Sequence, residues 1–263
     1  MTTQRFAMIA RDGAVCHVRL NRPERLNAVS EELYSDLEAA LLAAGGDPQV
    51  RAVLLAGEGR AFCAGADLKA HAERERTASE RRAYVWAGQR VCRLLQRMPQ
   101  PVVVAVQGYA IGAGAELALS GDVVVCAEDA QLRLPEVGLG TFVGGGVSQR
   151  LPLLVGQLRA KRLLLLGEPL SGSEAVTWGL ATEAVPADRL AARAAELARQ
   201  LADLPAQSVQ LAKEGLHRAG STSLDEALVF EAEGLLACMG SDDWTSGVAA
   251  FAAADRDREA PDA

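Results

Sequence analysis

Cysteine pairs and histidine clusters are missing from this 263-residue chain. Its five cysteines are scattered, odd in number and nowhere spaced as a CxxC pair, so we expect them to be reduced and structural. Its three histidines stand apart from one another and from any cysteine or carboxylate cluster. The sequence therefore predicts no metal site.

Long apolar runs and an excess of positive charge are also absent. The apolar runs are far shorter than a membrane span requires, and a net charge of −7 provides no basic face for nucleic acid. Residues 1–13 contain neither a signal-peptide core nor a clear transit peptide. We therefore expect a cytoplasmic protein with no nucleic-acid or membrane partner. Its length suits one large domain, or a domain with an appendage.

The common motifs for nucleotide binding and for serine hydrolases are not found. Gly112-Ala113-Gly114 begins a GxGxxG pattern, but Leu117 occupies the place of the third glycine, and no GxxxxGK(S/T) occurs. No GxSxG elbow is present, which argues against a serine hydrolase. Neither dinucleotide binding nor a P-loop is therefore predicted.

The most informative stretch that is present covers residues 102–117. Its first five residues are apolar and rich in valine, which predicts a buried strand. Glycine and other small residues follow, and Glu116 begins a helix-forming run that ends at Gly121. The strand thus leads through a glycine-rich turn into a helix N-terminus, where unpaired N–H groups and the helix dipole favour negative charge.

Residues 57–69 repeat this arrangement after a predicted buried strand at 52–56. Two such turns brought together would direct two backbone N–H groups at one oxygen, which stabilises an enolate or a tetrahedral oxyanion. Either turn alone is equally compatible with an ordinary structural connection between a strand and a helix.

The remaining segments alternate between predicted strands and helices, which indicates an α/β layer fold followed by a helical tail. Residues 70–82 are highly charged and form either a solvated helix or loop, or a mobile cover over a pocket. Further strands are expected at 15–20, 122–127 and 180–185, and a short strand and turn at 132–140. Further helices are expected from Ser30 to Gly45-Gly46, over 84–98, from Gly144 to an interruption at Pro152, and over 157–166, 173–178, 188–203, 205–219, 223–238 and 242–254.

Glu116 and Glu136 form a candidate acid–base pair. Both lie in apolar or glycine-rich runs, where a carboxylate is costly unless it is paired, hydrogen-bonded or protonated. Two carboxyl groups with separated pKa values can supply one base and one acid. The pattern alone also allows a surface or structural role for each.

Five further segments are distinctive: residues 20–28 (LNRPERLNA), 61–69 (AFCAGADLK), 107–117 (QGYAIGAGAEL), 134–140 (LPEVGLG) and 177–186 (TWGLATEAVP). They resemble the signature blocks of the enoyl-CoA hydratase/isomerase (crotonase) superfamily. Each block is weak alone, but all five occur in the family order. The resemblance implies a crotonase-like spiral of ββα units over residues 1–200 and a C-terminal helical oligomerisation region over 201–263. It also implies a homotrimer or a dimer of trimers.

The resemblance further implies an acyl-CoA thioester substrate and no separate cofactor, because coenzyme A is part of the substrate. The thioester oxygen would lie between the N–H groups of Ala66 and Ala113. Alanine at 113 departs from the glycine that is common there, but a backbone donor does not depend on its side chain. The positions expected near coenzyme A are Ala64, Asp67 and Leu68 at the adenine, and Arg25 and Lys69 at the phosphates or ribose. Arg25 and Lys69 are equally compatible with ordinary solvated charges.

Hydratases of the family carry both glutamates, so the leading hypothesis is hydration of a 2-enoyl-CoA to a 3-hydroxyacyl-CoA. Water would lie between Glu116, Glu136 and the Gly144 N–H, with Glu116 as base and Glu136 exchanging the proton at the α-carbon. The alternatives are double-bond isomerisation, hydration of an aryl-propenoyl-CoA, and a non-catalytic acyl-CoA-binding role. Three side chains are candidate pocket walls, with core packing as the simpler interpretation: Trp86, Leu139 and Phe142.

Overall fold

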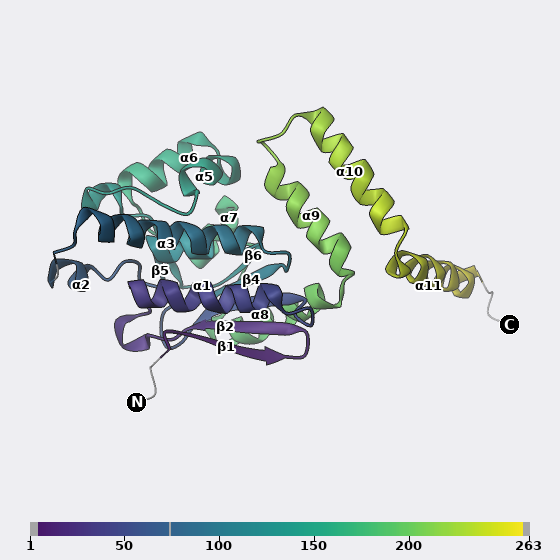
Figure 1. Ribbon diagram of the computed structural model, residues 1–263, viewed down its shortest axis with the longest axis horizontal. Helices are drawn as coiled ribbons and strands as arrows, with labels where there is room; N and C mark the ends of the chain where they lie inside the picture. Colours follow the sequence, from purple (N-terminus) through teal and green to yellow (C-terminus); the bar gives the residue numbers. More distant parts are fainter. Residues whose placement is uncertain (1–4, 74, 260–263) are drawn as a thin grey trace. The chain divides into compact units, whose positions relative to one another are not determined.

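The computed structural model describes residues 5–73 and 75–259 (Figure 1). By their internal contacts, residues 1–203 and 204–263 form two compact units. The expected oligomerisation region, residues 201–263, falls almost wholly in the second unit, and its last four residues lie outside the described part of the chain.

A six-stranded sheet forms the centre of the first unit. Its strands run in the order β1 (Ala7–Asp12), β2 (Val15–Leu20), β3 (Ala52–Gly57), β4 (Val102–Val106), β6 (Val123–Ala127) and β9 (Glu183–Val185). Only β1 is antiparallel to its neighbour. All five β4 residues are buried, as the unbroken valine-rich run predicts for a strand covered on both faces. β1 was not predicted, because Ala7 is its single buried residue.

A smaller sheet joins β5 (Tyr109–Ile111), β7 (Gln131–Arg133) and β8 (Leu170–Ser171). β5 lies within the stretch that the sequence analysis treated as a turn, between β4 and the short helix α4 (Ala113–Ala118). It pairs in parallel with β7. The segments that carry Glu116 and Glu136 therefore leave two adjacent strands.

Helices α1 (Glu31–Gly46) and α3 (Ala78–Arg97) pack against each other (Figure 1). Ser30 caps α1, and Leu33, Leu37 and Leu41 are buried along it, which confirms the predicted cap and repeat. A capping box between Thr77 and Glu80 begins α3. Part of the charged segment 70–82 is thus helical, in α2 (Leu68–Glu73) and α3.

The predicted interruption of a helix at Pro152 was wrong. Pro152 lies inside α5 (Val147–Val155) instead of interrupting it. A proline removes one backbone donor, and this short helix tolerates the loss and ends at Gly156, whose N–H bonds the Pro152 carbonyl. The other helices of the first unit are α6 (Gln157–Lys161), the π-helical turn η3 (Arg162–Leu166), α7 (Gly172–Trp178), α8 (Leu190–Asp203), and the 3₁₀ turns η1 (Pro23–Arg25), η2 (Val137–Leu139) and η4 (Ala187–Arg189).

The second unit is helical, as predicted, with α9 (Ala206–Arg218), α10 (Leu224–Met239) and α11 (Asp242–Glu259). α9 packs on α10, and the Arg218 guanidinium lies 4.5 Å from the Phe230 ring centre. The unit exposes many large apolar side chains, among them Leu216, Leu224, Leu228, Val229, Leu235, Leu236, Met239, Trp244, Val248 and Phe251. Within the described residues, no helix is both long and apolar enough to cross a membrane.

Candidate active site

The two glycine-rich turns meet, as the sequence predicts. Residues 61–67 run alongside β5, where the Cys63 N–H donates to the Tyr109 carbonyl (2.9 Å) and the Ile111 N–H donates to the Cys63 carbonyl (3.0 Å). On their other side the Val29 N–H donates to the Gly65 carbonyl (2.8 Å). The first turn is therefore held between the segment before α1 and the strand that leads into the second turn.

Glycine is required where these turns touch. A Cβ added at Gly114 would lie 2.1 Å from the Cys63 carbonyl oxygen. Gly65 has a φ of +92°, and its Cβ would lie 2.6 Å from the Ile111 carbonyl oxygen. Both clashes are with backbone, which cannot swing aside. The sequence pattern of small residues thus reflects a close approach between two backbones.

Two backbone donors face the cavity beside this junction. The Val29 N–H donates to the Gly65 carbonyl, and the Val29 carbonyl accepts from the Asp67 N–H. Ala66 lies between these two residues, so its own N–H faces away from Val29. Ala113 is the first residue of α4, whose N–H has no partner within the helix. Neither N–H meets an acceptor among the described residues, and both residues line the same cavity. This pair can bind one oxygen that carries negative charge.

A buried asparagine that the sequence analysis did not single out supports the first turn. Asn27 is fully buried, accepts from the Arg22 N–H (2.8 Å) and donates to the carbonyls of Glu58 (2.9 Å) and Ala61 (2.8 Å). Leu26 and Asn27 both have positive φ, 53° and 56°, a costly conformation for residues with side chains. Asn27 lies in residues 20–28, one of the segments that resemble the family's signature blocks, and this resemblance could have identified it.

Glu116 lies one turn into α4 and faces the cavity. Its Oε1 accepts from the Gly144 N–H at 2.6 Å. Burial raises the pKa of Glu116 to about 7; the Gly144 hydrogen bond lowers it, and the charge of Glu136 raises it. Gly144 thus orients Glu116 directly, and this bond occupies the N–H that the sequence analysis expected to contact water.

Glu136 follows β7 and Pro135, and only 7% of its surface is exposed. Its Oε2 is buried and has no hydrogen-bond partner among the described residues. Burial raises its pKa, although its own backbone N–H has the opposite effect. Gly112 leaves room for this carboxyl, since a Cβ there would lie 2.7 Å from Glu136 Oε1. Glu136 is therefore a buried carboxyl group whose neutral form is favoured.

The cavity that Glu116 and Glu136 share has a volume of about 530 Å³. Leu139 and Phe142 line it and are 58% and 69% exposed, so core packing was the wrong interpretation for them. Trp86 is also exposed and does not line it. An open apolar wall next to two carboxyls suits a ligand with an apolar chain.

Four of the residues expected near coenzyme A lie in the first turn, and Arg25 lies on η1. Ala64 and Leu68 line the cavity, whereas Arg25 and Lys69 are exposed and lie outside its lining. Asp67 is buried, and one of its oxygens lies 2.8 Å from Arg22 while the other accepts from the Ala70 N–H (3.1 Å). Burial raises the pKa of Asp67, but these two partners lower it below its usual value overall. Its side chain is thus tied to the protein, and contact between its backbone and adenine stays a prediction.

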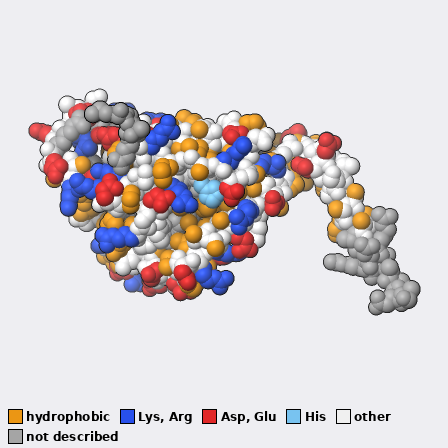
Figure 2. Space-filling model, turned by 90° about the horizontal axis from the view of Figure 1, so that it is seen from below, with side chains coloured by type: hydrophobic (Ala, Val, Ile, Leu, Met, Phe, Trp, Pro, Cys, Tyr) orange, Lys and Arg blue, Asp and Glu red, His pale blue; other side chains and the backbone are white. Residues whose placement is uncertain are grey.

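On the face seen in Figure 2, acidic and basic side chains are interspersed with apolar ones. Among residues 5–73 and 75–259, no group of three or more histidine, cysteine or acidic side chains could hold a metal ion.

Comparisons with known proteins agree with this architecture. The profile described as "Enoyl-CoA hydratase/isomerase" matches residues 10–257. A probable enoyl-CoA hydratase of Mycobacterium bovis is 33% identical over 251 residues, which are 95% of each chain. The 1,2-epoxyphenylacetyl-CoA isomerase of Escherichia coli is 37% identical over 91% of this chain and 92% of its own.

Solved structures show the same fold. The crystal structure of a putative enoyl-CoA hydratase from Streptomyces coelicolor A3(2) superposes with a TM-score of 0.90 at 32% identity, covering 96% of this chain and 93% of the other. The fold is therefore the crotonase fold, and the chain belongs to the enoyl-CoA hydratase/isomerase family.

Proposed function

We propose that this enzyme adds water to a 2-enoyl-CoA thioester and forms a 3-hydroxyacyl-CoA. The observation that carries the proposal is the placement of two carboxyls, the half-buried Glu116 and the buried Glu136, in one cavity with the free N–H groups of Ala66 and Ala113. Hydration needs a base for water, an acid for the α-carbon and a site for the enolate oxygen. The cavity supplies one group for each requirement.

In the proposed reaction, the thioester oxygen accepts hydrogen bonds from Ala66 and Ala113. Glu116 takes a proton from water as the water oxygen bonds to C3, and the electrons of the double bond move toward the thioester oxygen. The resulting enolate then takes a proton at C2 from Glu136. Each backbone donor contributes roughly 3 kcal/mol to stabilising the enolate. A proton moves from Glu116 to Glu136 before the next turnover.

The first turn and η1 would bind the coenzyme A part of the substrate. Ala64, Asp67 and Leu68 present their backbone to adenine, and Arg25 and Lys69 approach the phosphates or ribose. The exposed positions of Arg25 and Lys69 leave both cations accessible to such a ligand. Coenzyme A belongs to the substrate, and the proposed reaction needs no other cofactor.

A second candidate is isomerisation of a related acyl-CoA. The 37% identical relative is named as an isomerase, and the same enolate site would serve proton transfer without addition of water. Hydration of an aryl-propenoyl-CoA and simple acyl-CoA binding are further outcomes to be separated by experiment.

The test is a spectrophotometric screen with C4, medium-chain, branched and aryl enoyl-CoA thioesters, with Glu116→Ala as control. Loss of the conjugated thioester absorbance, with a 3-hydroxyacyl product identified by mass and missing in the variant, would support hydration. A product isomeric with the substrate would favour isomerisation. Binding without turnover would favour a binding role.

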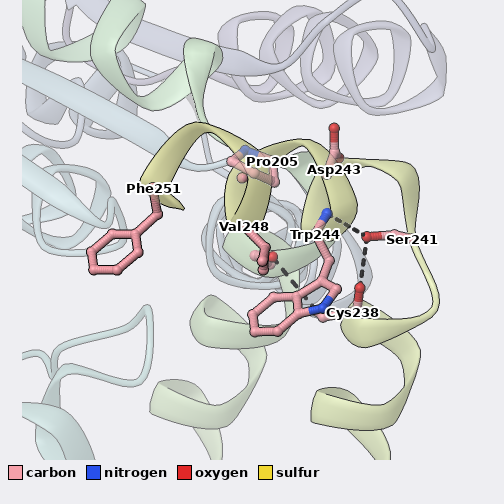
Figure 3. A pocket seen from close by; sticks show the side chains of 9 residues that line it. Pro205, Cys238, Ser241, Asp243, Trp244, Val248 and Phe251 are labelled. Carbon is pink, nitrogen blue, oxygen red and sulfur yellow. Dashed lines mark hydrogen bonds between the residues drawn. The ribbon is translucent and has the colours of Figure 1, made fainter. Parts of the chain in front are cut away.

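We also propose a homotrimer or a dimer of trimers, with the second unit providing contacts. This unit contains a mainly apolar hollow of about 440 Å³, lined by Cys238, Trp244, Val248 and Phe251 among others (Figure 3). Ser241 connects its walls, since its hydroxyl donates to the Cys238 carbonyl (2.7 Å) and accepts from the Trp244 N–H (3.2 Å). Light scattering should give three or six times the monomer mass, and a monomer would contradict the proposal.

A further inference from the structure

Gln89 on α3 lines the cavity but has no role in the mechanism proposed above. Its Oε1 accepts a hydrogen bond from the Gly145 N–H at 3.1 Å. That bond fixes which end of the amide is the acceptor, so Nε2 is the end that remains to donate. No described residue accepts a hydrogen bond from Nε2. Gln89 therefore has one end of its amide anchored and a free donor at the other.

The free donor lies near the same side of Gly144 as one oxygen of Glu116. A Cβ placed on Gly144 would stand 3.3 Å from Gln89 Nε2 and 2.8 Å from Glu116 Oε2, so neither atom is far from Gly144. Gln89, Glu116 and Gly144 all line the cavity, and the part of the cavity between these two atoms is called the hollow below. A water needs about two to four polar partners to be held in a buried site. The hollow offers it one donor and one acceptor beside the proposed base.

Gly144 itself does not have a free donor for this space. Its N–H already bonds Glu116 Oε1 at 2.6 Å. The bond leaves Oε2 as the Glu116 oxygen that faces the hollow. A molecule there needs its donor from another residue, and Gln89 is placed to supply it.

We propose that Gln89 orients the water that attacks the substrate, an inference that rests on the proposed hydration. Gln89 Nε2 donates to the water oxygen, while the water donates one of its hydrogens to Glu116 Oε2. In the reaction the water oxygen bonds to C3 and that hydrogen passes to Glu116. The Gln89 N–H keeps its proton throughout and fixes the direction of the oxygen lone pair. Gln89 thereby serves addition of water and not proton transfer at C2.

A nearby glutamine provides a matched control. Gln96 lies on the same helix and also bonds Gly145, but through Nε2 to the Gly145 carbonyl (3.1 Å) and to Ser120 Oγ (3.2 Å). It does not line the cavity. Loss of the Gln96 amide removes support for the same loop without removing a donor from the hollow.

The experiment compares Gln89→Met, Gln96→Met and the wild type in two reactions. The first is hydration of the best enoyl-CoA from the screen. The second is exchange of the α-hydrogens of the saturated acyl-CoA of the same chain length in D₂O, which needs the enolate site and Glu136 but no attacking water. We expect Gln89→Met to lower kcat for hydration roughly 100-fold, because misplaced reactants react that much more slowly, and to leave exchange nearly unchanged. We expect Gln96→Met to lower the melting temperature and to change both rates by a similar small factor.

Gln89→Glu provides a second variant of nearly the same shape. It keeps an acceptor for the Gly145 N–H, removes the donor and places a second negative charge near Glu116. We expect slow hydration whose acid limb moves to higher pH. Wild-type hydration in Gln89→Met, or an equal fall in both reactions, would overturn the role of Gln89 while the hydratase proposal stands. A wild type that hydrates no substrate would overturn the hydratase proposal and this role with it.

Discussion

The two segments that carry the carboxyl groups differ in how the fold supports them. α4 begins where the two glycine-rich turns meet, and its Glu116 carboxyl accepts a hydrogen bond from the Gly144 N–H at 2.6 Å. The turn after β7 buries Glu136 but leaves its Oε2 without a partner among the described residues. Burial raises the pKa of both carboxyls, but the donor that orients the first partly offsets the rise, whereas the second has an oxygen that no donor reaches among the described residues. Two chemically identical side chains thus become suited to different steps.

The largest effect should come from removing the junction on which α4 depends. In Gly114→Ala the new methyl group would stand 2.1 Å from the Cys63 carbonyl oxygen. We expect a loss of about 3 kcal/mol or more in unfolding free energy, because backbone must move. Urea unfolding measures this loss. Gly138→Ala is the matched control in the Glu136 segment, since nothing lies within 4 Å of its Cβ position, and it should change stability little.

The next effect compares the two carboxyls directly. We expect Glu116→Gln and Glu136→Gln each to lower kcat for hydration by about 10²- to 10⁴-fold, the usual contribution of an acid or base. The variants should differ in α-hydrogen exchange of a saturated acyl-CoA, which Glu136→Gln abolishes and Glu116→Gln largely retains. Deuterium uptake followed by mass spectrometry measures the exchange. Equal exchange in the two variants would remove the assigned difference in role.

A smaller effect concerns pH. Because burial raises the pKa of Glu116 to about 7, its base form is lost as the pH falls through that value. We expect kcat/KM for hydration to fall about tenfold per pH unit below pH 7, since one proton blocks the base. Initial rates between pH 5 and 8 give the profile, with circular dichroism to show that the protein stays folded. A flat profile across this range would contradict the role of Glu116 as base.

The smallest effect concerns how the stability of the fold depends on the ionisation of Glu116. The folded-state pKa of Glu116 is raised, so folding favours its neutral form, and that contribution is lost as pH rises from about 4.5 through about 7. Glu116→Gln should therefore unfold at a higher temperature than the wild type at pH 8, with a gain on the order of 1–3 kcal/mol, and at nearly the same temperature at pH 4.

Glu183 provides a control of opposite sign for the stability experiment. Arg193 holds the pKa of this carboxyl below its usual value through hydrogen bonds of 2.6 and 2.7 Å. Its contribution is present at neutral pH and lost as the pH falls through the lowered folded-state pKa. Glu183→Gln should lower the melting temperature at pH 8. A lower melting temperature in Glu116→Gln at pH 8 as well would show that the Glu116 carboxylate stabilises the fold.

Much of the fold could be predicted because its pattern is local. The valine run of β4, the Ser30 cap and the leucine repeat of α1 each follow from neighbouring residues. β1 was missed because an edge strand with one buried residue has no apolar pattern. β5 was missed because three residues inside a glycine-rich stretch become a strand only through pairing with β7.

Residue types and short spacings were enough to predict the family, the strand–turn–helix units, the two glycine-rich turns and the identity of the two carboxyls. These features depend on residue type and on spacing over a few positions, which can be read without knowing how distant segments pack. The folded structure was needed to show that Gly144 bonds Glu116, that one Glu136 oxygen is buried without a partner among the described residues, and that Gln89 has a free donor beside Glu116. The two hydrogen bonds among these relations join residues 28 and 56 positions apart along the chain, and contacts of that kind are determined by packing and not by local pattern.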